Sequence, residues 1–291
     1  MKGQLWLVGT PIGNLGDMTF RAVDCLRAAG RIYAEDTRRT RALLSHFGIE
    51  GKSLLSLHAH SPERDIQTAV EIMMAGEDVA VVTDAGMPSI SDPGTELVRA
   101  VRAAELIVQV IPGPSAVTTA VALSGFVDGP FTFLGFLPRK GSKRKKLLHV
   151  VSESPIPVVL FESPHRVTET LDDLNRHCGA TRRVAICREL TKKFEETRVV
   201  ELGATQVAGF FEHPQGEFTL VVDRCSEEAT DHQGFDLDEQ AQLLLDQGNS
   251  VRDVCTELLR ELERVGVKRT KREVYGLVQR LHDAQTTEPT P

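Results

Sequence analysis

The sequence predicts an α/β protein made of two α/β domains followed by a small helical module. Three observations support this fold class. Short runs rich in β-branched residues alternate with amphipathic stretches over residues 1–125, a less regular alternation covers residues 126–223, and residues 235–283 show helical periodicity alone. Because strands that alternate with helices form mostly parallel sheets covered on both faces, the first two regions are expected to be α/β domains.

The first domain is expected to contain five strands, each followed by a helix. Strand-forming runs lie at residues 5–8, 31–34, 53–57, 78–83 and 106–111. Ligands of open α/β sheets bind at the carboxyl ends of the strands. The loops that follow these runs are therefore the first places to look for a binding site.

The second domain begins at the apolar stretch 131–136 and is expected to contain more antiparallel pairing. Its other strands are predicted at 157–161, 183–187, 198–202 and 217–222, and its helices at 143–152, 167–177 and 204–211. This domain is expected to end near residue 223.

The polar residues 224–234 are expected to form a linker to the helical module. Helices are predicted at 237–247, 251–265 and 270–281. Three short helices with basic residues at the start of the last are similar to a helix-turn-helix module, whose final helix contacts nucleic acid. A helical cap or a dimerisation arm would show the same pattern.

The composition indicates a globular protein with one or two ordinary cores, since 41% of its 291 residues are hydrophobic and its net charge is −7. No apolar run approaches the roughly 18 to 20 residues of a membrane span, and the first residues lack the pattern of a signal peptide. A cytoplasmic protein is therefore expected. The five cysteines form no C-x-x-C pair, which argues against a disulfide framework and a zinc site.

Two concentrated basic segments stand out against the acidic average. Residues 139–146 hold six cations and residues 268–272 hold four, with no acidic residue in either. A single basic run is most often a solvated surface, but two of them in an acidic chain favour an anionic partner. The cations are Arg139, Lys140, Lys143, Arg144, Lys145, Lys146, Lys268, Arg269, Lys271 and Arg272.

Three loops rich in glycine and proline follow strands of the first domain, at residues 9–15, 82–94 and 112–116. Glycine permits close approach and proline stiffens a turn, so these loops are suited to holding their shape around a ligand. Neither G-x-x-x-x-G-K-[ST] nor G-x-G-x-x-G occurs, which argues against the common phosphate-binding turns. Asp84 and Asp92 lack companion ligands with metal-binding spacing, so no metal is expected. An organic cofactor without a phosphate tail remains.

Seven motifs occur in order between about residue 4 and residue 223. They are GTPIGNLGDMTFRA, AEDTRRT, VTDAGMPSISDPG, IPGPSA, GFLPRK, FESPHR and RELTKKFEE. Together they resemble the tetrapyrrole-methylase-like (class III) family of S-adenosylmethionine-dependent methyltransferases. Within that family the resemblance is to members that methylate the ribose 2′-oxygen of a cytidine in the decoding region of bacterial 16S rRNA.

The resemblance implies two α/β domains that enclose a cofactor cleft, usually in a homodimer, with S-adenosylmethionine as the cofactor. The implied partner is small-subunit ribosomal RNA in the 30S subunit. Carried onto this sequence, the cofactor contacts are Pro11, Asp84, Met87, Ser115, Ala116, Phe161, Leu190 and Thr219. A plain turn or core residue is the competing interpretation of each.

The resemblance also suggests groups that act on the substrate. Glu189 is the first choice for a base or a substrate-orienting group, and Lys192 and Arg38 are expected to hold phosphate. A salt-bridge network that lines the cleft would explain these three residues as well. The cations of 139–146 and 268–272 are the expected RNA contacts, since cations that neutralise phosphates dominate affinity.

Two other functions remain open at this point. One is a small-molecule methyltransferase of the same fold that acts on a corrin-type tetrapyrrole, which would have no evident use for the basic segment 139–146 or for a helical module. The other is a non-catalytic RNA-binding or ribosome-assembly factor, which would have no need of intact cofactor loops.

Overall fold

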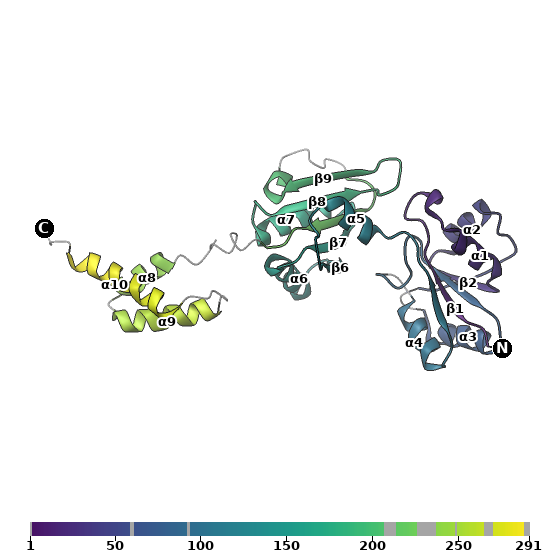
Figure 1. Cartoon of the computed structure of the whole chain (residues 1–291), viewed down its shortest axis with the longest axis horizontal. Helices are drawn as coiled ribbons and strands as arrows, with labels where there is room; N and C mark the ends of the chain where they lie inside the picture. Colours follow the sequence, from purple (N-terminus) through teal and green to yellow (C-terminus); the bar gives the residue numbers. More distant parts are fainter. Residues whose placement is uncertain are drawn as a thin grey trace. The chain divides into compact units, whose positions relative to one another are not determined.

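The computed structural model describes residues 2–58, 61–91, 94–206, 214–225, 237–247, 249–264 and 270–287 (Figure 1). The chain divides into two compact units, Met1–Cys225 and Ser226–Pro291. Nearly all of the predicted linker 224–234 lies outside the described residues.

The first sheet has five parallel strands in the order β3-β2-β4-β1-β5. The strands are β1 (Leu5–Val8), β2 (Arg31–Ala34), β3 (Ser53–Ser56), β4 (Val79–Val82) and β5 (Val108–Ile111). The predicted parallel sheet and the places of its five strands are thus confirmed. All five strands point their carboxyl ends to one edge, where the three glycine-rich and proline-rich loops leave β1, β4 and β5.

Helices cover both faces of this sheet (Figure 1). On one face lie α1 (Phe20–Ala28) and α2 (Thr37–His46), and on the other α3 (Glu63–Met74) and α4 (Thr95–Ala103). Side chains alternate along each strand. Leu5 and Leu7 therefore join the core under α3 and α4, while Val8 joins the core under α1 and α2.

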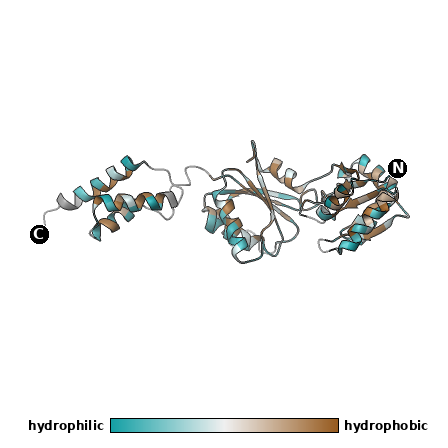
Figure 2. Ribbon diagram, turned by 90° about the horizontal axis from the view of Figure 1, so that it is seen from below, coloured by the Kyte–Doolittle hydropathy of each residue, from teal (hydrophilic) through white to brown (hydrophobic). Residues whose placement is uncertain are grey.

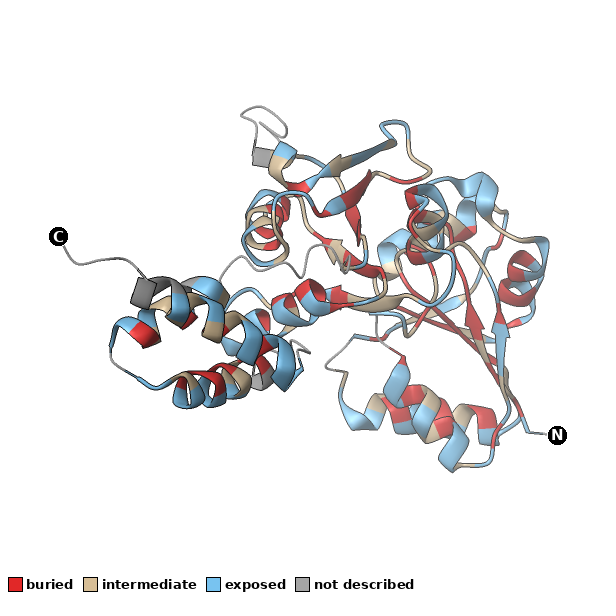
Figure 3. Ribbon diagram, turned by 60° about the vertical axis from the view of Figure 1, so that its left-hand side comes forward, coloured by how far each residue is buried: buried red, intermediate tan, exposed pale blue. Residues whose placement is uncertain are grey.

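The helices and strands of both sheets are held by this burial. Figure 2 shows hydrophobic faces on the helices, and Figure 3 shows the buried residues concentrated in the strands and the inner faces of the helices. Each fully buried leucine or isoleucine side chain contributes about 1.5 to 3 kcal/mol to the free energy of unfolding.

The second sheet is mixed, with the order β6-β7-β10-β8-β9, and only its β6–β7 pair is parallel. Its strands are β6 (Thr132–Phe136), β7 (Val158–Glu162), β8 (Arg183–Arg188), β9 (Glu196–Glu201) and β10 (Phe218–Val222). The expected antiparallel character is confirmed. Of the predicted helix at 204–211, residues 204–206 belong to a short 3-10 turn, η2 (Leu202–Gln206), and the rest lies outside the described residues.

Three helices pack on the second sheet. One face is covered by α6 (Ser142–Glu153) and α7 (Val167–Cys178), whereas the other is covered by α5 (Ala116–Ser124). Because α5 follows β5 directly, it carries the chain from the first sheet onto the second. The loop before α5 is therefore held between the two sheets of the first unit.

The second unit consists of α8 (Leu237–Asp246), α9 (Val251–Arg264) and α10 (Lys271–Thr287) around a core of its own. The three predicted helices are present, and α10 extends beyond its predicted end. Its start is fixed by a capping box, in which the Glu273 backbone N–H donates to Thr270 Oγ1 (3.3 Å) and the Thr270 backbone N–H donates to Glu273 Oε2 (2.7 Å).

Candidate functional site

The loops after β1, β4 and β5 pack against one another. Thr10 and Gly86 exchange both backbone hydrogen bonds, at 2.9 and 3.1 Å, and Thr10 Oγ1 donates to the Thr83 carbonyl oxygen (3.2 Å). Gly9 and Gly113 lie back to back. A Cβ atom on Gly113 would come within 2.9 Å of the Gly9 Cα atom, and one on Gly9 within 2.7 Å of the Gly113 Cα atom. The close contact of these loops depends on the absence of side chains there.

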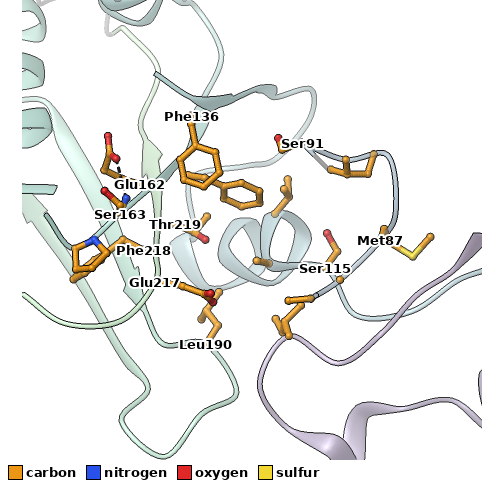
Figure 4. A pocket seen from close by; sticks show the side chains of 18 residues that line it. Met87, Ser91, Ser115, Phe136, Glu162, Ser163, Leu190, Glu217, Phe218 and Thr219 are labelled. Carbon is orange, nitrogen blue, oxygen red and sulfur yellow. Dashed lines mark hydrogen bonds between the residues drawn. The ribbon is translucent and has the colours of Figure 1, made fainter. Parts of the chain in front are cut away.

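A pocket of about 270 Å³ lies where these loops meet the second sheet (Figure 4). Its lining comes from the three loops, the start of α5, the ends of β6 and β7, the segment after β8 and the start of β10. The lining residues are Ile12, Ala85, Gly86, Met87, Ile90, Ser91, Ser115, Ala116, Val117, Phe136, Phe161, Glu162, Ser163, Pro164, Leu190, Glu217, Phe218 and Thr219. Most of the lining is apolar, and a few polar groups point into it.

Six of the eight predicted cofactor residues line this pocket. They are Met87, Ser115, Ala116, Phe161, Leu190 and Thr219. Pro11 is buried outside the lining, and its neighbour Ile12 takes the place at the wall.

Asp84 also lies outside the lining, where it joins two loops of the first sheet. Its Oδ1 accepts the Asp36 backbone N–H (3.0 Å) and its Oδ2 accepts an N–H from Arg39 (3.1 Å). Burial raises the pKa of Asp84, and the nearby Glu35 adds to the rise, although the bonds from Asp36 and Arg39 act in the opposite direction. Asp84 thus fixes the loop whose next residue, Ala85, reaches the pocket.

Several lining residues were absent from the predicted site, although two of them, Phe136 and Glu162, lie inside the motifs. Phe136 ends β6 in GFLPRK, Glu162 ends β7 in FESPHR, and Glu217 precedes β10. Their common signal is position at a strand end on the edge that the loops face. That signal depends on strand order in the second sheet, which the sequence does not display.

A buried charged network lies behind the pocket wall. Glu162 has a fully buried side chain that accepts the Thr170 hydroxyl (2.7 Å) and the Ser163 backbone N–H (2.8 Å). Arg166 is paired with Glu162 at 3.5 Å and donates to the Leu137 carbonyl oxygen at 2.7 Å. The network therefore ties the end of β7 to the segment that follows β6.

Arg144 belongs to this network and corrects the predicted RNA-binding set. It is only 5% exposed, and its guanidinium contacts Asp173 (2.7 Å), Thr170 Oγ1 (3.1 Å) and the Pro138 carbonyl oxygen (3.1 Å). A guanidinium that is buried and fully bonded inside the domain cannot also reach a phosphate on the surface. Its prediction as an RNA contact was wrong. The basic run alone does not reveal the internal role of Arg144, because its partner Asp173 lies 29 residues further along the chain.

The other predicted RNA contacts lie at two places in the chain. Arg139, Lys140, Lys143, Lys145 and Lys146 are exposed around the start of α6. In the second unit, Lys271 and Arg272 are exposed in the first turn of α10, whereas Lys268 and Arg269 lie outside the described residues.

Glu189 and Lys192 are brought together at the edge of the pocket. Lys192 Nζ donates to Glu189 Oε1 (2.8 Å) and to Glu217 Oε2 (2.9 Å), and Glu189 Oε1 also accepts the Glu217 backbone N–H (3.0 Å). Burial alone raises the pKa of Glu189, but the bonds from Lys192 and Glu217 outweigh it and lower the net value. A carboxylate with a lowered pKa is a weak base, so this geometry suits an orienting role better than proton removal.

Arg38 lies elsewhere, in the first turn of α2, and lines no part of the pocket. Its guanidinium is paired with Asp36 at 2.9 Å, and its side chain is largely exposed. It lies at the exposed edge of the first sheet and not inside the pocket.

The described residues contain neither a metal-binding cluster nor a membrane-spanning helix. Over those ranges, no group of three or more His, Cys, Asp or Glu side chains is arranged to hold a metal ion. None of the described helices is long and apolar enough to cross a membrane.

Known proteins share the fold of the first unit. The family model of the tetrapyrrole (corrin/porphyrin) methylases matches residues 4–206, which include β1 to β9. The solved uroporphyrin-III C-methyl transferase from Thermus thermophilus, complexed with S-adenyl homocysteine, has a TM-score of 0.55. That match covers 75% of this chain and 97% of the solved chain at 18% identity, a level that concerns the fold alone. The family model, which covers more than half of the chain, defines it as a methylase of the tetrapyrrole class.

Relatives in sequence narrow this class. A protein of Xylella fastidiosa named ribosomal RNA small subunit methyltransferase I is 44% identical over 228 residues, or 78% of this chain and 83% of that protein. A protein of the same name from Halalkalibacterium halodurans is 44% identical over 225 residues, or 76% of each chain. The chain belongs to the ribosomal RNA small subunit methyltransferase I family, within the tetrapyrrole methylases.

Proposed function

We propose that the protein is an S-adenosylmethionine-dependent methyltransferase that methylates the ribose 2′-oxygen of a cytidine in the decoding region of 16S rRNA. The observation that carries this proposal is the 44% identity, over more than three quarters of the chain, to proteins named for ribosomal RNA methylation. Two structural features support it. The pocket offers a place for the methyl donor, and the exposed cations around the start of α6 offer a surface for an anionic polymer.

The pocket suits S-adenosylmethionine by its chemistry. Its volume of about 270 Å³ lies just below the roughly 300 to 1,000 Å³ of typical ligand pockets. Ile12, Met87 and Phe161 provide apolar walls for an adenine ring. At the edge, Glu189 and Glu217 share the single ammonium of Lys192, which leaves a net negative charge that favours a cationic ligand. When bound, S-adenosylmethionine supplies a methyl group activated by a positive sulfur.

The start of α5 provides donors for the amino-acid end of such a ligand. The first backbone N–H groups of a helix have no partner within it and favour an anion. Ser115, at the N-cap of α5, makes no capping bond with its side chain and lines the pocket together with Ala116. Both features fit a carboxylate.

Lys192 is the proposed residue beside the target hydroxyl, and Glu189 is its positioning partner. Lys192 is held between Glu189 and the pocket-lining Glu217, so its ammonium is fixed at the edge of the pocket. The ammonium orients the ribose or binds the adjacent phosphate there. Arg38 binds a phosphate further along the RNA. Positioning supplies much of the rate in such a transfer, so no strong base is required.

The exposed cations of 139–146, together with Lys271 and Arg272, bind the RNA backbone. The substrate is carried in the 30S subunit, the enzyme acts as a homodimer, and it works in the cytoplasm. The domains are assigned as 1–125, 126–223 and 235–283, with the last as an RNA-binding module.

Methylation of small ribosomal subunits tests the proposal. Subunits from a strain that lacks the enzyme are incubated with the protein and labelled S-adenosylmethionine, and the modified nucleotide is mapped. Label on the ribose of one cytidine of the decoding region is expected. Label on another atom or on no RNA would contradict the proposal, and failure to bind the cofactor in calorimetry would favour a non-catalytic assembly factor.

A charge-neutralising variant tests the RNA surface separately. Replacement of Lys143, Lys145 and Lys146 by glutamine should weaken RNA binding and flatten its salt dependence, because fewer counterions are released. Affinity for the cofactor should stay unchanged, since none of the three lines the pocket. Unchanged RNA affinity would exclude this surface.

A further inference from the structure

One exposed aromatic side chain at the rim of the pocket has no role in the function described so far. Phe136 is the last residue of β6 and is 54% exposed. It lines the pocket on the same side as Ser91, opposite Leu190 and Glu217 (Figure 4). A single exposed hydrophobic residue is ordinary on a protein surface. Phe136 differs in lying at the rim of the pocket.

A β-bulge directs Phe136 to this position. Phe133 pairs with Val159 and Phe136 pairs with Phe161, and the register shifts between them, so that Leu134 is the extra residue. In a regular strand, residues three apart point to opposite faces. The bulge therefore brings Phe133 and Phe136 to the same face, and without it Phe136 would point toward α6 and α7.

The bulge depends on Gly135. This residue has a φ of +65°, a conformation that disfavours other side chains, and a Cβ atom there would lie 2.9 Å from Ser91 Oγ. The local backbone is thus specialised in a way that exposes an aromatic ring instead of burying it.

Phe136 extends an aromatic surface from the inside of the pocket to its mouth. The rings of Phe133 and Phe161 pack edge to face with centroids 4.9 Å apart, and the ring of Phe136 is tilted against Phe161 at 5.6 Å. Phe161 is the partly buried, inner member and suits the cofactor's adenine. Phe136 is the outer member and presents a free face to a second ligand.

The exposed cations Arg139 and Lys140 follow Phe136 within four residues, so at ~3.8 Å per residue their Cα atoms lie at most about 15 Å from it. The backbone between them is fixed, because Arg166 donates to the Leu137 carbonyl oxygen (2.7 Å) and Arg144 to the Pro138 carbonyl oxygen (3.1 Å). An aromatic face beside phosphate-binding cations is the arrangement that binds an unpaired nucleotide, with the base stacked and the backbone neutralised.

We infer that Phe136 is the stacking platform for the base of the target nucleotide, which must leave its neighbours for its ribose to enter the pocket. This inference rests on the proposed function and adds a base-binding subsite to it. The ligand is an unpaired pyrimidine nucleotide within RNA, recognised by its π-face and its flanking phosphates.

A two-by-two experiment tests the inference. Wild-type protein and Phe136→Ala are each titrated with a short RNA that contains the target cytidine and with the same RNA carrying an abasic site there. Since stacking of one base on an aromatic ring is worth about 1 to 3 kcal/mol, Phe136→Ala should bind the complete RNA roughly 5- to 150-fold more weakly. On the abasic RNA, the two proteins should differ by less than about twofold because the contact is missing for both.

Further variants make the result specific. Phe136→Tyr should restore RNA affinity and turnover, whereas Phe136→Leu, apolar but without a ring, should not. Phe20→Ala removes another exposed phenylalanine, one that does not line the pocket, and should change neither. Affinity for S-adenosylhomocysteine should be the same in all of them.

Four outcomes would overturn the inference. Equal loss on both RNAs would mean that Phe136 does not contact the base, and a loss of S-adenosylhomocysteine affinity would assign the ring to the cofactor. Unchanged RNA affinity in Phe136→Ala, with normal methylation by the wild type, would disprove the base-binding subsite but leave the proposed function standing. A wild-type protein that neither binds nor methylates the RNA would remove the proposed function as well.

Discussion

Arg144 shows how one residue in a basic run can have a structural role. All residues of the segment 139–146 are described, and Arg144 is the buried cation among them. It lies on the inner side of α6, where it contacts Asp173 of α7 and the carbonyl oxygen of Pro138. Its charge is therefore compensated within the domain, and the surface charge of the segment comes from its neighbours.

Replacement of Arg144 should cost stability and leave the RNA surface charge intact. Arg144→Met removes one partner of a buried ion pair, which costs about 3 kcal/mol, the lower end of the range for such pairs because Asp173 keeps Arg176. Lys145→Met, on the exposed side of the same helix, should change stability by less than about 0.5 kcal/mol. Urea unfolding of both variants measures this, and equal losses would refute a structural role specific to Arg144.

The pH dependence of the same variant follows from Asp173. Burial alone raises the pKa of Asp173, but Arg144 and Arg176 outweigh it and hold the pKa below its ordinary value. A lowered pKa means that ionised Asp173 stabilises the fold above its unfolded-state pKa of about 3.9, and that this contribution is lost as pH falls through the folded-state value.

The stability difference between the wild type and Arg144→Met should therefore shrink as the pH is lowered from about 7 to about 3. Urea unfolding at several pH values gives this difference directly. Lys145→Met serves as the control and should follow the wild-type curve throughout. A difference that stays constant over this range would show that packing, and not the ion pair, accounts for the loss.

At the scale of elements, the pocket is made by strand ends and the loops that leave them. The contact between Gly9 and Gly113 sets the distance between the loops after β1 and β5. The Thr10–Gly86 bridge joins the first of these loops to the one after β4. Three loops with no regular structure are thus fixed to each other by backbone contacts, and Ile12 and Ala85 anchor two of them in the core under α5.

Gly113→Ala should open this arrangement. Its Cβ atom would meet the Gly9 Cα and carbonyl carbon at 2.9 Å, which forces the backbone to shift and costs about 1 to 3 kcal/mol. Because the next residues include Ser115 of the pocket wall, affinity for S-adenosylhomocysteine should fall about tenfold or more. Gly129→Ala, which would meet nothing within 4 Å, should change neither quantity. Equal calorimetric affinities for all three proteins would disprove the coupling.

The sequence predicts the elements better than it predicts the pocket that they build. The strands of the first sheet are found within two residues of their predicted ends, because apolar β-branched runs flanked by turn residues are a local signal. Phe136 could not be placed in the same way, because its orientation results from a bulge against β7. Glu217 reaches the pocket only because β10 lies between β7 and β8, which is a property of sheet topology.

At the scale of the whole molecule, the pocket belongs to the first unit, and the second unit is a separate helical domain. The helix α5 starts at the pocket and packs on the second sheet, so the two sheets of the first unit share the site. The second unit has a separate core formed by α8, α9 and α10. The pocket is lined wholly by residues of the first unit, whereas exposed cations occur in both.

Because the pocket belongs to the first unit alone, we expect that cofactor binding can be separated from the contribution of the second unit to RNA binding. A protein that ends at residue 225 keeps every lining residue and should bind S-adenosylhomocysteine as the full chain does. Its turnover on small ribosomal subunits should fall, because the cations of α10 are lost. A full-length Lys271→Gln, Arg272→Gln variant separates loss of these charges from loss of the whole module.

In that variant, the slope of log affinity against log salt concentration should become shallower by about 1.4, since each contact with single-stranded RNA contributes roughly 0.7. Reduced turnover in both proteins would assign RNA binding to the first turn of α10. Loss in the truncated protein alone would point to another surface of the three helices. Full turnover without residues 226–291 would show that the first unit carries the whole activity, and that its own exposed cations suffice to hold the substrate.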